Sequence, residues 1–146
     1  MKKKINLYSS DTSTELSLPI ADAGIKAGFP SPAQDYMDSA IDLNKELVRH
    51  PATTFYGRVN GDSMVDAQVF DGDILVIDKS IEPQNKDMAV CFIDGEFTLK
   101  FIEIKEEVVY LIPANKEYKP IKVTLDHDLQ IWGVVTYVIH KVNKRV

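Results

Sequence analysis

The chain has little of what marks secreted, membrane-spanning or nucleic-acid-binding proteins. Its 146 residues include a single cysteine, Cys91, which excludes an internal disulfide framework and is typical of a reducing cytoplasm. No run of about 18 apolar residues occurs, so a membrane span is not expected. The net charge of −5 repels a phosphate backbone at long range, so direct sequence-specific DNA binding is not expected either.

Signals for a metal or an organic cofactor are also scarce. The aspartates between residues 62 and 78 lack the regular spacing and the final glutamate of a calcium-binding loop. The sequence has no zinc signature and no glycine-rich loop that could hold a phosphate. His50, His127 and His140 have no companion nearby in the sequence that would complete a triad or a metal site, and each is interpreted as a surface residue. We expect no metal and no cofactor.

What the sequence does contain is the pattern of a β-rich domain. A length of 146 residues with 45% hydrophobic content is sufficient for one core. Segments rich in Val, Ile, Phe and Tyr alternate with turn residues, and Asp94-Gly95 between two such segments indicates a hairpin. The expected strands are Thr53–Val59, Ile74–Asp78, Met88–Ile93, Phe97–Ile104, Val108–Pro113 and Leu129–Val142. We therefore predict a mainly β fold of strongly curved, largely antiparallel sheets with a short helical segment.

The N-terminal part of the chain departs from this pattern. Residues 1–30 show no sustained period of about 3.6 or 2 and are predicted to form an extended or mobile arm before a β-rich domain over residues 31–146. The segment Ser31–Gln34 has the capping residue, the proline and the glutamine of a helix start. Apolar residues then continue at roughly helical spacing to Val48, which fits one helix or two short helices with the second beginning at Asp42.

Two side chains stand out as candidates for chemistry. Ser63 follows Gly61-Asp62 in a turn that can project its hydroxyl beside backbone N–H groups, although most serines in such turns are only turn residues. Lys100 lies within a predicted core strand, where lowering its pKa from about 10.4 to about 7.5 corresponds to roughly 4 kcal/mol of destabilisation of the charged form. Such an amine could act as the general base for a serine. Its same-face neighbours, Thr98 and Ile102, do not decide between this role and exposure to solvent.

These motifs occur in an order that identifies a family. The segments that carry the resemblance are Gly28–Tyr36, Gly61–Met64, Asp71–Leu75, Asp94–Lys100, Leu111–Asn115 and Trp132–Val135. Together they resemble the LexA/UmuD self-cleaving serine peptidases, and the first of them, with the later segment Ile41–Asn44, resembles UmuD-like members in particular. The resemblance covers the chain from about residue 27 to the end, and it implies the LexA/UmuD-type peptidase fold for the domain.

The resemblance implies a set of site residues. Ser63 would be the nucleophile of a Ser-Lys dyad, Lys100 its base, and the backbone N–H groups of Asp62 and Ser63 would bind the oxyanion. Members of the family cut their own chain at an Ala–Gly or Cys–Gly bond, and this sequence has two Ala–Gly bonds, Ala23–Gly24 and Ala27–Gly28. We choose Ala27–Gly28 because the Phe-Pro-Ser-Pro-Ala segment that follows the family's cut comes directly after it.

The resemblance also implies a biological setting. Such proteins form homodimers, cut themselves when stimulated by the RecA–single-stranded DNA filament of the SOS response, and then serve as a subunit of the Y-family polymerase UmuC in error-prone translesion synthesis. Only 27 residues precede the expected cut, which is too few for a helix-turn-helix repressor domain. The alternative is a non-enzymatic docking module for a polymerase or a mobile-element regulator, in which cleavage matters little.

Overall fold

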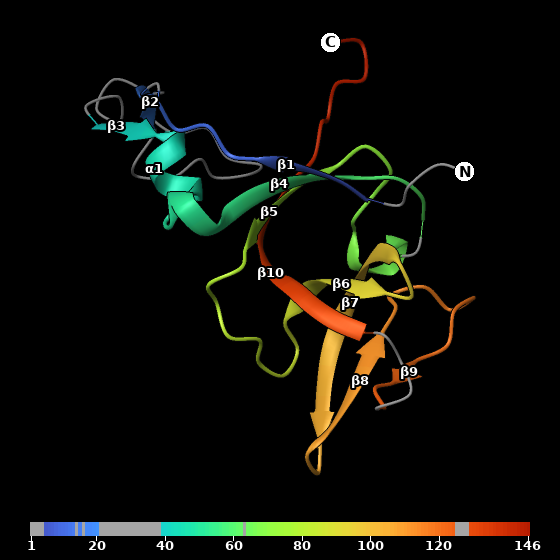
Figure 1. Cartoon of the computed structure of the whole chain (residues 1–146). Coiled ribbons are helices and arrows are strands. Elements are labelled where there is room, and N and C mark those ends of the chain that lie inside the picture. Colours follow the sequence, from blue (N-terminus) through green and yellow to red (C-terminus); the bar gives the residue numbers. More distant parts are fainter. Residues whose placement is uncertain (1–4, 14, 16, 21–38, 63, 125–128) are drawn as a thin grey trace.

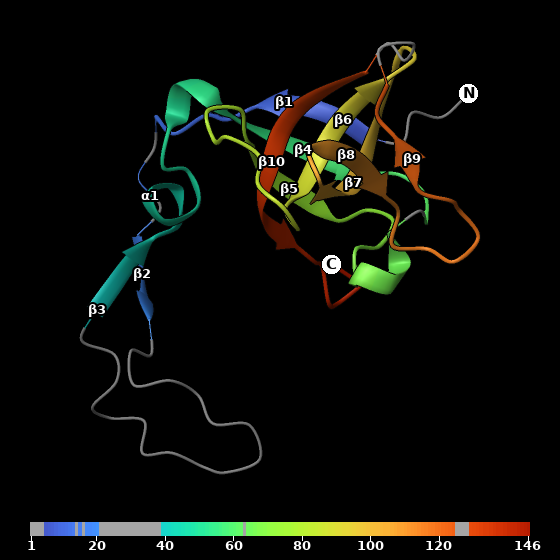
Figure 2. The ribbon, with the colours of Figure 1, turned by 90° about the horizontal axis from the view of Figure 1, so that it is seen from below.

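The computed structural model of the chain describes residues 5–13, 15, 17–20, 39–62, 64–124 and 129–146. The largest unit of structure is one eight-stranded sheet in which every neighbouring pair of strands is antiparallel. In spatial order the strands are β1 (Ile5–Ser9), β4 (Thr54–Val59), β5 (Ile74–Asp78), β10 (Leu129–Ile139), β6 (Met88–Ile93), β7 (Glu96–Lys105), β8 (Val108–Ile112) and β9 (Ile121–Lys122). Figures 1 and 2 show that this sheet is strongly curved, which confirms the predicted fold class.

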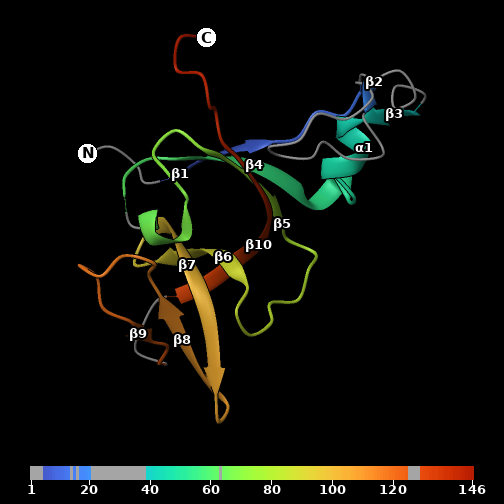
Figure 3. The same cartoon turned by 180° about the vertical axis from the view of Figure 1, so that it is seen from behind.

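Strand β10 joins the two halves of the curved sheet. Its first half, Leu129–Val134, pairs with β6, and its second half, Val134–Ile139, pairs with β5. Figure 3 shows β10 passing between these two neighbours. The register shifts near Gly133, where an added Cβ would lie 2.6 Å from Cγ2 of Ile77. Only glycine allows this close approach of the two strands, and the sheet can therefore bend around its central strand.

Two clusters of buried residues fill the interior of the curved sheet. The first surrounds Leu75, Ile77 and Val90, and the second contains Ala89, Cys91, Ile102 and Leu111. The alternating residues of β6 and β7 divide between the two clusters, as expected for strands that are covered on both faces. Both faces of this hairpin are therefore withdrawn from solvent along much of its length.

A second, two-stranded sheet and a short helix precede β4. The strands β2 (Ser17–Ile20) and β3 (Ser39–Asp42) are antiparallel, and α1 spans Leu43–Leu47. The Asp42 side chain accepts a hydrogen bond of 2.9 Å from the Asn44 backbone N–H, so the predicted helix start at Asp42 is confirmed. The prediction of a helix before that point is wrong for residues 40 and 41, which are in β3, because strand pairing overrides their helical spacing. The predicted helix start at Ser31–Gln34 lies outside the described residues.

The remaining short elements are two 3-10 turns and strand β1, which is one of the strands that the sequence did not indicate. The turns span Pro51–Thr53 and Val65–Ala67. Strand β1 falls within the stretch predicted as an arm, yet all five of its residues pair with β4, and Ile5 is buried. The boundary at residue 30 stays a prediction, but residues 5–9 are part of the main sheet rather than an extension beyond it.

Two of the three histidines are placed, and both lie against a buried aspartate. His50 Nδ1 is 2.6 Å from Asp78 Oδ2, and His140 Nδ1 is 2.6 Å from Asp73 Oδ1. Both histidines are exposed, as predicted, whereas both aspartates are buried. His127 lies outside the described residues. The two contacts join residues 28 and 67 positions apart, so each histidine shields the carboxylate of a distant strand end from solvent.

Asp78 accepts several hydrogen bonds at the end of β5. Thr53 Oγ1 donates to Asp78 Oδ1 at 2.9 Å, and the backbone N–H and Oγ of Ser80 donate to the same oxygen at 2.9 and 2.7 Å. Burial raises the pKa of Asp78, but the hydrogen bonds from His50, Ser80 and Thr53 outweigh it and lower the pKa from 3.8 to about 2. The ionised carboxylate is therefore the form that the fold stabilises.

We expect Asp78→Asn to reduce the free energy of unfolding by about 2 kcal/mol at pH 7. Because the folded pKa lies below the unfolded one, this contribution is complete above about pH 4 and is lost as the pH falls toward 2. Urea unfolding of the wild type and the variant at pH 7 and pH 2.5 measures it. An equal difference between the two proteins at both pH values would contradict the assignment.

Candidate active site

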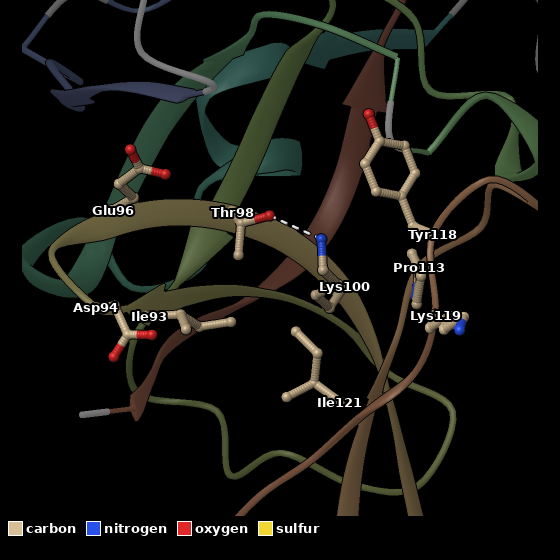
Figure 4. A pocket seen from close by; sticks show the side chains of 9 residues that line it. All are labelled: Ile93, Asp94, Glu96, Thr98, Lys100, Pro113, Tyr118, Lys119 and Ile121. Atoms are coloured by element: carbon tan, nitrogen blue, oxygen red, sulfur yellow. Dashed lines mark hydrogen bonds between the residues drawn. The ribbon is translucent and has the colours of Figure 1, made fainter. Parts of the chain in front are cut away.

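Lys100 lies in the middle of β7 and is almost fully buried, with 6% of its surface exposed. Its Nζ donates hydrogen bonds to Thr98 Oγ1 at 2.8 Å and to the Leu99 backbone carbonyl at 3.3 Å. Figure 4 shows the amine directed back along the strand toward the Thr98 hydroxyl. Burial penalises the charged form of an amine, and both of these acceptors are neutral oxygens. The interpretation of Lys100 as a strand residue on a wet face is therefore excluded.

Strand β6, which pairs with β7, presents a buried, apolar face to Lys100. In the β6–β7 register Ala89 is opposite Lys100 and Cys91 is opposite Thr98, so these four side chains share one face of the hairpin. Ala89 and Cys91 are fully buried. Burial raises the pKa of the Cys91 thiol to about 12, although the nearby Lys100 charge opposes this. Cys91 is thus an inert core residue.

A pocket of about 290 Å³ opens beside the Lys100 amine. Its lining comes from the β6–β7 hairpin, from the loop after β8 and from β9. The nine residues are Ile93, Asp94, Glu96, Thr98, Lys100, Pro113, Tyr118, Lys119 and Ile121. In Figure 4 the acidic pair Asp94 and Glu96 lies at one end of the pocket, and Tyr118 and Lys119 lie at the other. The pocket is large enough for a few residues of an extended peptide chain.

The turn that contains Ser63 is fixed on both sides by described neighbours. Gly61 has φ of 107°, a conformation that favours glycine, and its N–H donates to Asp71 Oδ1 at 2.9 Å. The Asp62 carbonyl accepts a hydrogen bond of 2.8 Å from Asn115 Nδ2.

On the other side of Ser63, Met64 is 2% exposed, and its sulfur lies 3.2 Å from the backbone nitrogen of Ala114. Both flanks of Ser63 therefore contact the segment Pro113–Tyr118, whose end residues line the pocket beside Lys100. This loop therefore connects the two flanks of Ser63 with the pocket beside Lys100, although Ser63 and Lys100 are about 40 residues apart in the chain. Ser63 itself lies outside the described residues.

The predicted site residues divide into those that the structure places and those that it does not. Lys100 is in a pocket, and the backbone carbonyl of Asp62 is tied to the loop that borders it. Ser63, Ala27 and Gly28 lie outside the described residues, so their roles stay predictions. Thr98 was noted only as a neighbour on the same face; its position two residues before Lys100 in a strand was the signal that it could accept a hydrogen bond from the amine.

Searches of the described residues for other kinds of site give two further findings. No helix in the described ranges is long and apolar enough to cross a membrane. Within the same ranges, no group of three or more histidine, cysteine, aspartate or glutamate side chains is arranged to hold a metal ion. The pocket beside Lys100 is the place where the described structure brings a buried amine to an opening.

Comparison with known proteins gives consistent relatives. A family model described as Peptidase S24-like matches residues 19–136. Protein SamA of Salmonella typhimurium (strain LT2) is 44% identical over 115 residues, which is 79% of each chain. Protein MucA of Escherichia coli is 37% identical over 136 residues, which is 92% of each chain. The LexA repressor of Shewanella denitrificans is 35% identical over 136 residues, or 92% of this chain and 65% of the repressor.

The chain therefore belongs to the S24-like peptidase family, a family of self-cleaving serine peptidases. Within that family it is a UmuD-like protein of the LexA/UmuD group. The curved antiparallel sheet and the buried lysine on β7 agree with this assignment.

We expect the Cys91 thiol to resist labelling in the folded protein, because it is fully buried and its pKa is raised to about 12. With an aromatic disulfide reagent at pH 8, the folded chain should react at least about a hundredfold more slowly than the chain unfolded in guanidinium. Equal rates in the two states would show that the face shared by Cys91 and Lys100 is open to solvent.

Proposed function

We propose that the chain is an autocatalytic serine peptidase that removes its own N-terminal segment at Ala27–Gly28. The observation that carries the proposal is the burial of the Lys100 amine beside a pocket whose bordering loop holds both flanks of Ser63. A buried amine held by neutral acceptors is suited to act as a general base near neutral pH. The family assignment supports the reaction class, and this arrangement supports the choice of Ser63 and Lys100 as the reacting residues.

In the proposed reaction, Ser63 Oγ attacks the carbonyl carbon of Ala27 while its proton passes to neutral Lys100 Nζ. The backbone N–H groups of Asp62 and Ser63 stabilise the negative oxygen of the tetrahedral intermediate. The intermediate collapses as the Lys100 ammonium returns the proton to the nitrogen of Gly28, which leaves as a new amino terminus. Water, deprotonated by the same amine, then hydrolyses the ester between Ser63 and Ala27.

Thr98 supports this chemistry as a positioning residue. A neutral amine has two N–H groups and one lone pair, and the hydrogen bonds to Thr98 Oγ1 and to the Leu99 carbonyl use both N–H groups. The lone pair then has a defined direction, and in the proposal it accepts the Ser63 proton. A strand is a rigid support for such an amine, so little reorganisation is needed during the reaction.

We further propose that cutting is controlled by an effector and by partners. Because the scissile bond and the nucleophile belong to one fold or one homodimer, positioning rather than affinity sets the rate. The RecA–single-stranded DNA filament would raise the population in which residues 27 and 28 lie in the pocket. The shortened chain would then act as a subunit of a UmuC-type translesion polymerase in the cytoplasm, within SOS mutagenesis.

Incubation of the purified chain at alkaline pH tests the chemistry without any partner. Deprotonation of Lys100 should produce slow self-cutting, and the large fragment should begin at Gly28. Ser63→Ala and Lys100→Arg should each reduce the rate by at least about a thousandfold, since arginine cannot lose its proton. Lys105→Ala, on the exposed end of the same strand, is the matched control and should cut at the wild-type rate.

Mass spectrometry of the fragments gives the readout. Persistent cutting at the wild-type rate in either dyad variant would refute the dyad. A wild-type chain that stays intact, both at alkaline pH and with activated RecA filament, would instead favour the non-enzymatic docking module.

Thr98→Val should slow cutting by about tenfold or more, because it leaves an N–H of the buried amine without an acceptor. The midpoint of the pH–rate profile should also move to lower pH, since the lost hydrogen bond stabilises the ammonium more than the neutral amine. Thr98→Ser should restore both properties. A slower rate with an unchanged midpoint would show that Thr98 has only a packing role.

A further inference from the structure

The pocket beside Lys100 has an acidic end that the proposed chemistry does not use. Asp94 and Glu96 both line the pocket and flank Gly95 in the β6–β7 turn. Asp94 and Gly95 have φ values of 49° and 88°, which fix the turn and therefore the direction of its side chains. Both residues are exposed, and the ion pairs formed among the described residues leave both carboxylates without a cationic partner.

This acidic end is close to the amine that would carry the reaction. Glu96, Thr98 and Lys100 alternate along β7 and so face the same side of the strand. Four residues of strand span about 13 Å between Cα atoms, and the Lys100 amine points back toward Thr98, which shortens the separation. Glu96, Thr98 and Lys100 therefore form a row along one wall of the pocket, with Glu96 toward the β6–β7 turn.

The sequence contains two Ala–Gly bonds that could enter this pocket. The segment Ala21–Gly28 reads Ala-Asp-Ala-Gly-Ile-Lys-Ala-Gly and contains both Ala23–Gly24 and Ala27–Gly28. The residues after the two glycines, Ile25 and Phe29, are both apolar. The residues before the two alanines differ in the sign of their charge. Asp22 precedes Ala23, whereas Lys26 precedes Ala27.

We propose that Asp94 and Glu96 select the bond that is cut, by attracting Lys26 beside Ala27–Gly28 and repelling Asp22 beside Ala23–Gly24. The inference rests on the proposed function, which supplies the reaction and the bond but no physical reason why Ala27–Gly28 is cut in preference to Ala23–Gly24. Each pairing of exposed charges changes a rate by about two- to fivefold. Attraction at one bond and repulsion at the other multiply, so together they change the ratio of the two products by about tenfold or more.

The ratio of the two large fragments is the quantity to measure. Purified chain is incubated at pH 9, where Lys26 is still charged, and fragments that begin at Gly28 and at Gly24 are quantified by intact mass. Because the same Ser63 and Lys100 would cut both bonds, any change in the pKa of Lys100 alters both rates equally and cancels in the ratio. Substitutions at the acidic end therefore report on selection alone.

Asp94→Asn with Glu96→Gln removes both charges and keeps a residue that tolerates the left-handed conformation at position 94. Because it removes both the attraction and the repulsion, this variant should raise the Gly24-to-Gly28 ratio by about tenfold, and the difference should shrink in 1 M salt. Exchanging the two charges by Asp22→Lys with Lys26→Asp reverses the preference and should raise the ratio by about a hundredfold, whereas Lys26→Arg should leave it unchanged. Glu106→Gln with Glu107→Gln, in the β7–β8 turn of the same sheet, is the matched control and should also leave it unchanged.

The possible outcomes separate the inference from the function on which it rests. Normal cutting with the same ratio in the acidic-end variant and in the charge exchange would overturn the selection while leaving the peptidase intact. An equal change of ratio in the Glu106/Glu107 control would also overturn it, because the effect would then come from net charge. A wild-type chain that never cuts would refute the proposed function and this inference together.

Discussion

The burial of one amine in the middle of a strand is the constraint on which the rest of the site depends. Lys100 is 6% exposed, and two neutral oxygens from its own strand accept its described hydrogen bonds. The two aspartates that are buried among the described residues, Asp73 and Asp78, have a different environment from Lys100. Each lies 2.6 Å from a histidine that can carry a positive charge. For Asp78 the hydrogen bonds lower the pKa to about 2, so the fold favours the charged form of that carboxyl.

The curved sheet allows such an amine to meet groups from distant parts of the sequence. Strand β10 pairs with β5 on one side and with β6 on the other. The turn between β4 and β5 that includes Gly61 and Asp62 and the β6–β7 hairpin therefore belong to the same sheet. The loop after β8 then contacts both sides of the turn through Asn115 and Ala114. No local motif places Lys100 near that turn. The long-range strand order and the loop after β8 connect the two.

The sequence predicted the central strands well, because a strand packed on both faces has a strong hydrophobic signature. All six expected strands exist, with boundaries that shift by three residues or fewer. The strands that were missed, β1, β2, β3 and β9, have two to five residues each and lie at sheet edges or in the small second sheet. Their formation depends on pairing partners elsewhere in the chain, as in the pairing of Ile5–Ser9 with β4, which no local pattern encodes. The aspartate partners of His50 and His140 escaped notice for the same reason.

The candidate site, like the strands, could be predicted only in part from local sequence patterns. Family motifs indicated Lys100 as a base, and alternation placed Thr98 on its face, but only the described structure shows that the amine is buried and which residues border its pocket. In the proposed mechanism, control comes from how often the segment around residues 27 and 28 enters the pocket. An effector can change that population only by binding more tightly to the entered state, so its contacts must include surfaces that differ between the two states.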